Sequence, residues 1–118
     1  MKKEIIEIHG AKSPEGPDGK PSAPISMAVR AGDFVFVSGL APIDPAIGEM
    51  IKGDIQVQTR QSLNNVKAAL EATGTTLENV VKATVYCTNS GYFEKVSEVY
   101  GEFFLEDPPA RTFITVGS

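Results

Sequence analysis

Hydrophobic and polar positions alternate in several short stretches of the chain, and this two-residue period is typical of β-strands with one buried face. Two neighbouring stretches are separated only by Ala31 and Gly32, so together they predict a hairpin. The alternation predicts five strands in all, at residues 4–9, 26–30, 33–38, 80–87 and 111–116.

A period of about 3.6 residues replaces this alternation over residues 55–72 and predicts a helix there. Asp54 is a suitable N-cap, because its carboxylate can accept a hydrogen bond from a free N–H group of the first turn. Gly74 provides the stop. The stripe that we expect to face the core consists of Val57, Leu63, Val66 and Leu70.

A second helix is expected to begin at an N-cap near Asn89 or Ser90 and to run to about Phe104. It cannot continue through Pro108 and Pro109, because proline lacks the N–H group and its ring clashes with the preceding turn. Its apolar residues at helical spacing are Phe93, Val96, Tyr100, Phe103 and Phe104.

The order β-β-β-α-β-α-β predicts an α+β fold in which one single-layer mixed β-sheet carries both helices on one face. The strand at residues 33–38 has Phe34 and Phe36 on one face and valines on the other, so both faces need cover. Two helices cover one face, and the apolar remainder of the other predicts self-association. Residues 1–118 are expected to form a single domain, with a Pro/Gly-rich loop at residues 10–24.

Composition restricts the classes of function. The chain has 118 residues with 11 Lys+Arg against 15 Asp+Glu, which gives a net charge of −4. This acidic balance disfavours nucleic acid as a partner, because phosphate-backbone binders present a basic surface. No stretch approaches the roughly 20 apolar residues of a membrane span, and none has the form of a signal peptide.

Cysteine and histidine each occur once, as Cys87 and His9. A single thiol cannot form an intramolecular disulfide, and this usage is typical of a cytoplasmic protein. The two residues are too few for a typical zinc site, and no metal is predicted, although carboxylates alone could still bind an ion. We interpret Cys87 as a core residue of its strand. His9 could act as a general base, although a hydrogen-bonded surface imidazole is the commoner outcome.

The common catalytic motifs are absent: the chain has no dinucleotide-binding glycine motif, no phosphate-binding loop, no zinc-protease motif and no hydrolase nucleophile elbow. Arg111 is the strongest remaining candidate, because Pro108-Pro109 stiffen the approach to its strand and a planar guanidinium suits bidentate capture of a carboxylate. Ser38-Gly39 is the second, because a glycine at a strand end lets a ligand approach the backbone. The alternatives are a surface ion pair for Arg111 and a simple turn for Gly39.

The run SGLAPIDPAIGEMIKGDIQVQTRQSLNNVKAALEATGTTLENVVKATVY, followed by YFEKVSEVYGEFF and PPARTF, resembles the RidA family, also called YjgF/YER057c/UK114. The resemblance covers most of residues 26–116. It implies a chorismate-mutase-like subunit, a homotrimer and three sites in the clefts between subunits. It also implies hydrolysis of short-lived enamines and imines, such as 2-aminoacrylate, to ammonia and a 2-oxo acid without a cofactor.

The resemblance also implies roles for individual residues. Arg111 matches the carboxylate-binding arginine, and Gly39, after Ser38, matches the backbone site beside the reacting nitrogen. Phe113 stands where archetypal members have a cysteine whose backbone N–H helps to hold the carboxylate. These three positions and Ser38 are therefore candidate site residues.

Three departures from the family pattern concern the rest of the site. Ser97 stands where many members have asparagine, and Ile25 replaces a tyrosine of the pocket wall, so both are candidate substrate-binding positions with altered polarity. The family's last strand, which carries a glutamate thought to position water, is expected after Ser118. These departures leave the substrate open.

Three functions remain after the sequence is read. The first is an imine/enamine deaminase that acts on a carboxylate-bearing substrate, with a bulkier or more apolar substrate favoured by Ile25. The second is an endoribonuclease or translation inhibitor, an activity also attached to the family, but the chain lacks the basic and aromatic surface that RNA binding needs. The third is a non-catalytic trimer that binds a small metabolite in the same cleft.

Overall fold

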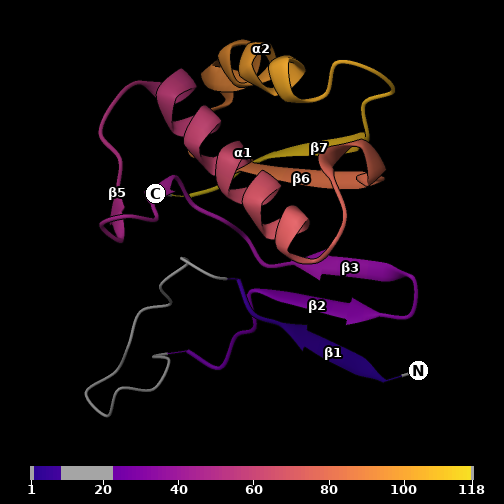
Figure 1. Ribbon diagram of the computed structural model, residues 1–118. Coiled ribbons are helices and arrows are strands. Elements are labelled where there is room, and N and C mark those ends of the chain that lie inside the picture. Colours follow the sequence, from indigo (N-terminus) through magenta and orange to yellow (C-terminus); the bar gives the residue numbers. More distant parts are fainter. Residues whose placement is uncertain (1, 9–22, 118) are drawn as a thin grey trace.

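The computed structural model describes residues 2–8 and 23–117, and in them the strands and helices follow the predicted order (Figure 1). His9 and nearly all of the expected loop at residues 10–24 lie outside the described residues. The elements are β1 (Lys3–Ile6), β2 (Ala28–Ala31), β3 (Phe34–Val37), β4 (Ile43–Asp44), β5 (Glu49–Met50), α1 (Ile55–Ala72), the short 3₁₀ helix η1 (Leu77–Asn79), β6 (Lys82–Cys87), the 3₁₀ turn η2 (Ser90–Tyr92), α2 (Phe93–Phe103) and β7 (Ala110–Thr115).

The strands form three separate ladders among the described residues, so the predicted single sheet is wrong in its pairing. β1, β2 and β3 are antiparallel in sequence order, β4 and β5 form a short hairpin, and β6 pairs with β7 in parallel. The predicted hairpin is therefore confirmed, and the second hairpin, formed by β4 and β5, lies outside the five predicted strands. Alternation specifies which face of a strand is buried but not which strand lies beside it, so the sequence pattern could not exclude this arrangement.

The two ends of α1 are fixed as the sequence predicted. The Asp54 carboxylate accepts a hydrogen bond from the Val57 N–H at 2.9 Å, which satisfies one free donor of the first turn. At the other end Thr73 caps the helix, and Gly74 follows with φ +90°. That φ is favourable only for residues without a Cβ, so the glycine ends the helix there.

The helix α2 begins a few residues later than the sequence pattern suggested. The Asn89 side chain accepts a hydrogen bond from the Gly91 N–H at 2.8 Å and caps the 3₁₀ turn η2 rather than the α-helix itself. The α-helix starts at Phe93 and ends before Phe104. An Asx cap competes locally with helical hydrogen bonding, which accounts for the shift.

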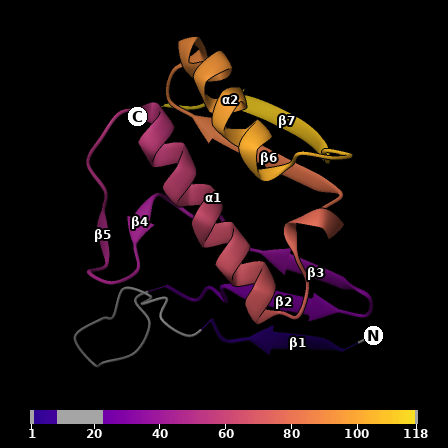
Figure 2. The same ribbon diagram turned by 45° about the horizontal axis from the view of Figure 1, so that its top comes forward.

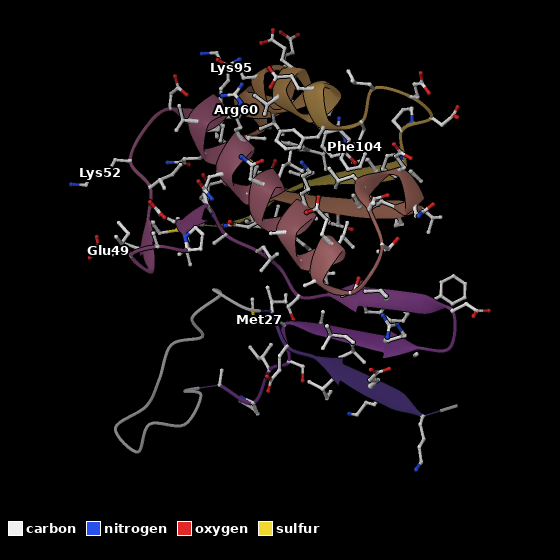
Figure 3. All side chains as sticks on the ribbon, in the orientation of Figure 1. Met27, Glu49, Lys52, Arg60, Lys95 and Phe104 are labelled. Carbon is white, nitrogen blue, oxygen red and sulfur yellow. The ribbon has the colours of Figure 1, made fainter. Side chains whose placement is uncertain are left out.

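Both helices lie on the same side of the strands, with α1 crossing between the β1–β3 ladder and the β6–β7 pair and α2 lying over β6 and β7 (Figures 1 and 2). Side chains fill the layer between α2 and these two strands, where Phe104 lies (Figure 3). Cys87 is buried in the same layer, which confirms its assignment to the core. The buried hydrophobic residues are Ala28, Ala69, Leu70, Cys87, Val96, Val99, Tyr100 and Phe104.

The opposite side of the strands is open to solvent in the single chain and carries large apolar side chains. Phe34 and Phe36 of β3 are 62% and 61% exposed, and Tyr86 of β6 is exposed as well. Valines 35 and 37, on the other face of β3, are half-buried. One side of the layer thus belongs to the core of the chain, and the other lacks a cover within it.

Candidate functional site

Arg111 lies near the start of β7, in the parallel pair with β6, where Ala83 is its partner in the register. It is half-buried and shares its face of the strand with Phe113, which is also half-buried. This face is the one covered by α2, because the intervening Thr112 is exposed. The pattern of β7 therefore directs the guanidinium toward the helix rather than into solvent.

Three side chains of α2 contact the Arg111 guanidinium. Its Nη2 donates a hydrogen bond to the Ser97 Oγ at 2.9 Å. Its Cζ lies over the Phe93 ring, 5.1 Å from the centroid, and over the Tyr100 ring, 4.8 Å from the centroid. Residues 93, 97 and 100 have the i, i+4, i+7 spacing that places side chains on one face of a helix.

No carboxylate neutralises Arg111 within the described residues. The ion pairs found there are Arg30 with Glu4, Arg60 with Glu102, and a longer contact of Lys67 with Glu71. Arginine remains charged at any ordinary pH. The guanidinium therefore carries a positive charge that no carboxylate among the described side chains balances. Its N–H groups are hydrogen-bond donors suited to a negatively charged ligand.

Tyr100 is the most deeply buried member of this group, at 7% exposure. Burial raises the pKa of its phenol above the usual value, and the nearby positive charge of Arg111 partly opposes that shift. The phenol is therefore neutral at physiological pH. Its hydroxyl oxygen is inaccessible to solvent and has no hydrogen-bond partner among the described residues.

The other candidate residues divide into two groups. Phe113 belongs with Arg111, because its ring meets the Phe93 ring edge to face, with the centroids 5.2 Å apart and the planes at 74°. Ile25 is 63% exposed and makes no such contact. The Ser38 hydroxyl donates to the Ser26 carbonyl at 2.7 Å and its N–H to the Met27 carbonyl at 2.9 Å, which ties the end of β3 back to the residues before β2.

Gly39 has free space where a Cβ would stand, because apart from its own chain neighbours no atom of the described residues lies within 4 Å of that position. No hydrogen bond joins Gly39 or Ser38 to Arg111 in the part of the chain that the structure describes. In Figure 1 the arrow of β3 points to the left, so Gly39 follows its left-hand end, whereas β7 begins at its own right-hand end. The two groups of candidate residues thus lie at opposite ends of the strands of one chain.

The described part of the chain contains neither a cluster of metal-ligating side chains nor a helix that could span a membrane. Within residues 2–8 and 23–117, no three side chains from His, Cys, Asp and Glu come together as metal ligands. None of the helices described is both long and apolar enough to cross a bilayer. The Cys87 thiol is buried and donates to the Asn89 carbonyl, with the sulfur and oxygen 3.6 Å apart.

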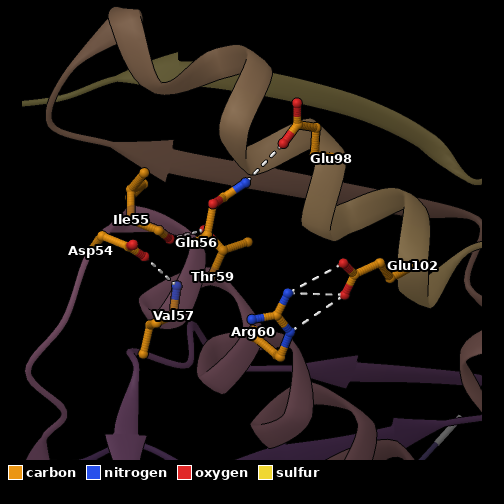
Figure 4. Close-up of polar contacts among 8 residues, drawn as sticks. All are labelled: Asp54, Ile55, Gln56, Val57, Thr59, Arg60, Glu98 and Glu102. Atoms are coloured by element: carbon orange, nitrogen blue, oxygen red, sulfur yellow. Dashed lines mark hydrogen bonds and ion pairs between the residues drawn. The ribbon is translucent and has the colours of Figure 1, made fainter.

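A second cationic region lies away from Arg111, in the angle between the two helices. Figure 4 shows Gln56 and Arg60 of α1 bonded to Glu98 and Glu102 of α2. Arg60 contacts both oxygens of Glu102 at 3.1 to 3.3 Å. A shallow groove of about 330 Å³ opens beside this pair, and Arg60, Asn64, Lys67, Leu77, Glu102 and Phe103 line it.

Sequence reasoning assigned Phe93 and Tyr100 only to the core stripe of α2. The structure adds that these rings contact Arg111, which the helical period alone could not reveal. A signal did exist, because Ser97 is a polar residue between the two aromatic residues on the same helical face. Only the parallel pairing of β6 and β7 brings an arginine opposite that face.

Comparison with known proteins identifies relatives along most of the chain. The family model described as Endoribonuclease L-PSP matches residues 17–118. A RutC family protein of Pyrococcus horikoshii is 52% identical over 97 residues, which cover 82% of this chain and 77% of the relative.

Two solved structures are similar as well. RidA of an Antarctic Psychrobacter has 30% identity and a TM-score of 0.85, with 98% of this chain and 87% of RidA covered. E. coli TdcF with bound serine has 35% identity and a TM-score of 0.82, with 96% and 85% covered. The predicted resemblance is confirmed, and the chain belongs to the L-PSP endoribonuclease family, whose relatives include RutC and Rid proteins.

Proposed function

We propose that this protein is a hydrolytic deaminase of reactive enamines and imines that carry a carboxylate, such as 2-aminoacrylate and other 2-imino acids. The observation that carries the proposal is Arg111, a half-buried arginine held by α2 with no acidic partner among the described residues. A small carboxylate would supply the missing negative charge through a bidentate, charge-assisted pair with N···O distances of about 2.7–2.9 Å. The bound serine of TdcF, a relative, is a small molecule with such a carboxylate.

The reaction demands little of the protein beyond positioning. An enamine first tautomerises to the imine, and water then adds to the imine carbon. The resulting carbinolamine collapses as its C–N bond breaks, which releases ammonia and leaves a 2-oxo acid. Because the uncatalysed barrier is low, holding the carboxylate on Arg111 and the nitrogen at a backbone site supplies much of the required orientation. No redox step or cofactor enters this balance.

The backbone site that the proposal requires is Gly39, next to Ser38. In one chain Gly39 follows the C-terminal end of β3 and Arg111 lies at the N-terminal start of β7, with no hydrogen bond between them among the described residues, so the proposed site takes the two from different copies. A homotrimer with sites between subunits meets that need, in agreement with the resemblance to the RidA family. The exposed apolar face with Phe34, Phe36 and Tyr86 supports association of this kind.

The substrate range is proposed to extend to side chains larger than that of 2-aminoacrylate. Ile25 is an exposed apolar residue where archetypal members have a tyrosine, and Phe113 adds an aromatic ring beside the arginine. Ser97 is a smaller group than asparagine, and its hydroxyl is already bonded to Arg111. These changes exchange polar groups of the pocket for apolar surface and space.

Turnover is the direct test of the proposal. The protein is incubated with 2-aminoacrylate generated in situ and with 2-imino acids of increasing side-chain size, and 2-oxo acid formation is followed against an Arg111→Ala variant. Arg60→Ala provides a matched control, since it also removes an arginine that contacts α2. Hydrolysis of every compound at the same rate with the native chain and with Arg111→Ala would refute the deaminase.

The position of the site between copies has its own test, which is complementation. Arg111→Ala and Gly39→Val subunits are each expected to be inactive alone, and a mixed trimer regains about one intact site in three. The Gly39 substitution has room in the single chain, so loss of folding is not expected. Absence of recovered activity in verified mixed trimers would contradict a shared site.

Ribonuclease activity is the second candidate, because the matching family model carries that name. The net charge of −4 argues against it, and the cations Arg60 and Lys67 have glutamate neighbours. RNA cleavage that persists through purification and is lost in a defined variant would favour it. Binding of a 2-oxo acid through Arg111 with no imine hydrolysis would instead favour the third function, a metabolite-binding trimer.

A further inference from the structure

We infer that Phe93 and Tyr100 are positioning residues, whose two rings hold the Arg111 guanidinium in place for a carboxylate ligand. The inference rests on the proposed function, because it concerns how that site holds its ligand. Neither residue is argued to touch the ligand. Their effect is expected to pass through Arg111.

Helix geometry supports this assignment. Phe93 and Tyr100 are seven residues apart, which corresponds to about 10.5 Å along the helix axis. The Arg111 Cζ lies 5.1 Å from one ring centroid and 4.8 Å from the other, so both rings are within the range of a cation–π contact. Aromatic faces attract a cation through their negative quadrupole, and here two rings of one helix act on the same guanidinium.

The middle of the same helical face fixes the rotation of the guanidinium. Ser97 lies between the two rings in sequence and accepts a hydrogen bond from Nη2 at 2.9 Å. Two rings lie against the guanidinium and the hydroxyl holds Nη2, and no hydrogen bond of the remaining N–H donors is found among the described residues. A planar fork that is already oriented loses less conformational freedom when a carboxylate binds, which strengthens binding.

The two rings differ in how deeply they are buried. Tyr100 is buried and packs against Phe104, with the centroids 4.6 Å apart, so the core holds it in place. Phe93 is 47% exposed and rests edge to face on Phe113. Phe93 is therefore the ring that can be changed without opening the core, and it is the appropriate site for a test.

A double-mutant cycle measures whether Phe93 acts through Arg111. Phe93→Leu, Arg111→Ala and the double variant are compared with the native chain by calorimetric titration with 2-oxobutanoate, a stable 2-oxo acid. Phe93→Leu is expected to weaken binding by about 3- to 5-fold, the equivalent of one exposed cation–π contact. In the Arg111→Ala background the same substitution is expected to change binding by less than about 2-fold, because no guanidinium remains to be positioned.

Further variants separate positioning from packing. Phe93→Tyr retains the ring and is expected to keep native affinity, and Phe103→Leu removes an aromatic residue of α2 that does not contact Arg111. Imine hydrolysis by Phe93→Leu should show a raised KM with little change in kcat, because the positioned group binds the carboxylate. Equal loss of affinity in both backgrounds, or no loss in either, would overturn the inference.

The outcome is separable from that of the proposed function. Binding of 2-oxobutanoate that depends on Arg111 and Phe93 without any imine hydrolysis would remove the deaminase and retain the positioning role. Imine hydrolysis that requires Arg111 but has the same kcat and KM in Phe93→Leu would retain the deaminase and remove the positioning role.

Discussion

Arg111 and Arg60 each contact the helix α2, but they are held in opposite ways. Arg60 is exposed and bonded to both oxygens of Glu102, so its charge is already balanced (Figure 4). Arg111 is half-buried between two aromatic rings and a hydroxyl, with no acidic partner among the residues described. The helix α2 thus presents a carboxylate to Arg60 and only neutral groups to Arg111.

This difference indicates which of the two arginines can bind a ligand. An exposed ion pair in water contributes little free energy and leaves no unmatched charge. A guanidinium fixed by neutral groups keeps its electrostatic attraction for an incoming carboxylate, and its partial burial strengthens that attraction.

The largest effect is expected from Arg111→Lys, which keeps the charge but loses the planar fork. We expect kcat/KM for 2-imino acids to fall by about 10- to 100-fold, as for the loss of a hydrogen bond to a charged group. Light scattering on the same preparation should find the oligomeric state of the native chain. Dissociated subunits with unchanged activity per assembled oligomer would mean that Arg111 braces an interface between subunits instead.

Ser97→Asp would give Arg111 an internal carboxylate partner, as Arg60 already has in Glu102. The Ser97 Oγ is 2.9 Å from Nη2, so a carboxylate at this position can pair with the guanidinium. Affinity for 2-oxobutanoate is expected to fall by about 10-fold, because the ligand must now compete with an internal anion. Ser97→Asn is the neutral control of similar size, and an unchanged affinity in Ser97→Asp would break the comparison.

Tyr100→Phe removes the hydroxyl and keeps the ring, so we expect native ligand affinity and a gain in stability of up to about 1 kcal/mol at pH 7. The pH dependence follows from the raised phenol pKa. Above about pH 10 the unfolded phenol loses its proton while the folded one retains it, so the native chain loses stability as the pH rises. Urea unfolding from pH 8 to 11 should reveal a shallower alkaline decline in the variant, and identical declines would contradict this account.

The smallest effect is expected from Arg60→Ala. Removing an exposed ion pair should lower the free energy of unfolding by about 0.2–1 kcal/mol, and added salt should reduce that difference. Urea unfolding at low and high ionic strength measures it. Imine hydrolysis should remain native, whereas a loss comparable to that of Arg111→Lys would show that the two arginines do not differ as argued.

Much of the secondary structure could be predicted from single residues and from the spacing of hydrophobic positions. Asp54 and Gly74 determined both ends of α1, and the proline pair limited α2. The pairing of strands could not be predicted in the same way. The alternation of hydrophobic residues in β3 and β6 does not indicate whether these two strands are hydrogen-bonded to each other. Register and strand partners depend on contacts between distant segments.

The sequence alone determined the candidate arginine, the family resemblance and the elements that carry the site. It could not determine what surrounds Arg111, since Phe93 and Tyr100 have the same helical spacing whether they pack in a core or hold a cation. That distinction required the tertiary structure, in which the β6–β7 pair brings Arg111 against one face of α2. Likewise, only the folded chain separates Gly39 from Arg111, because the distance between two strand ends is set by packing and not by their order in the sequence.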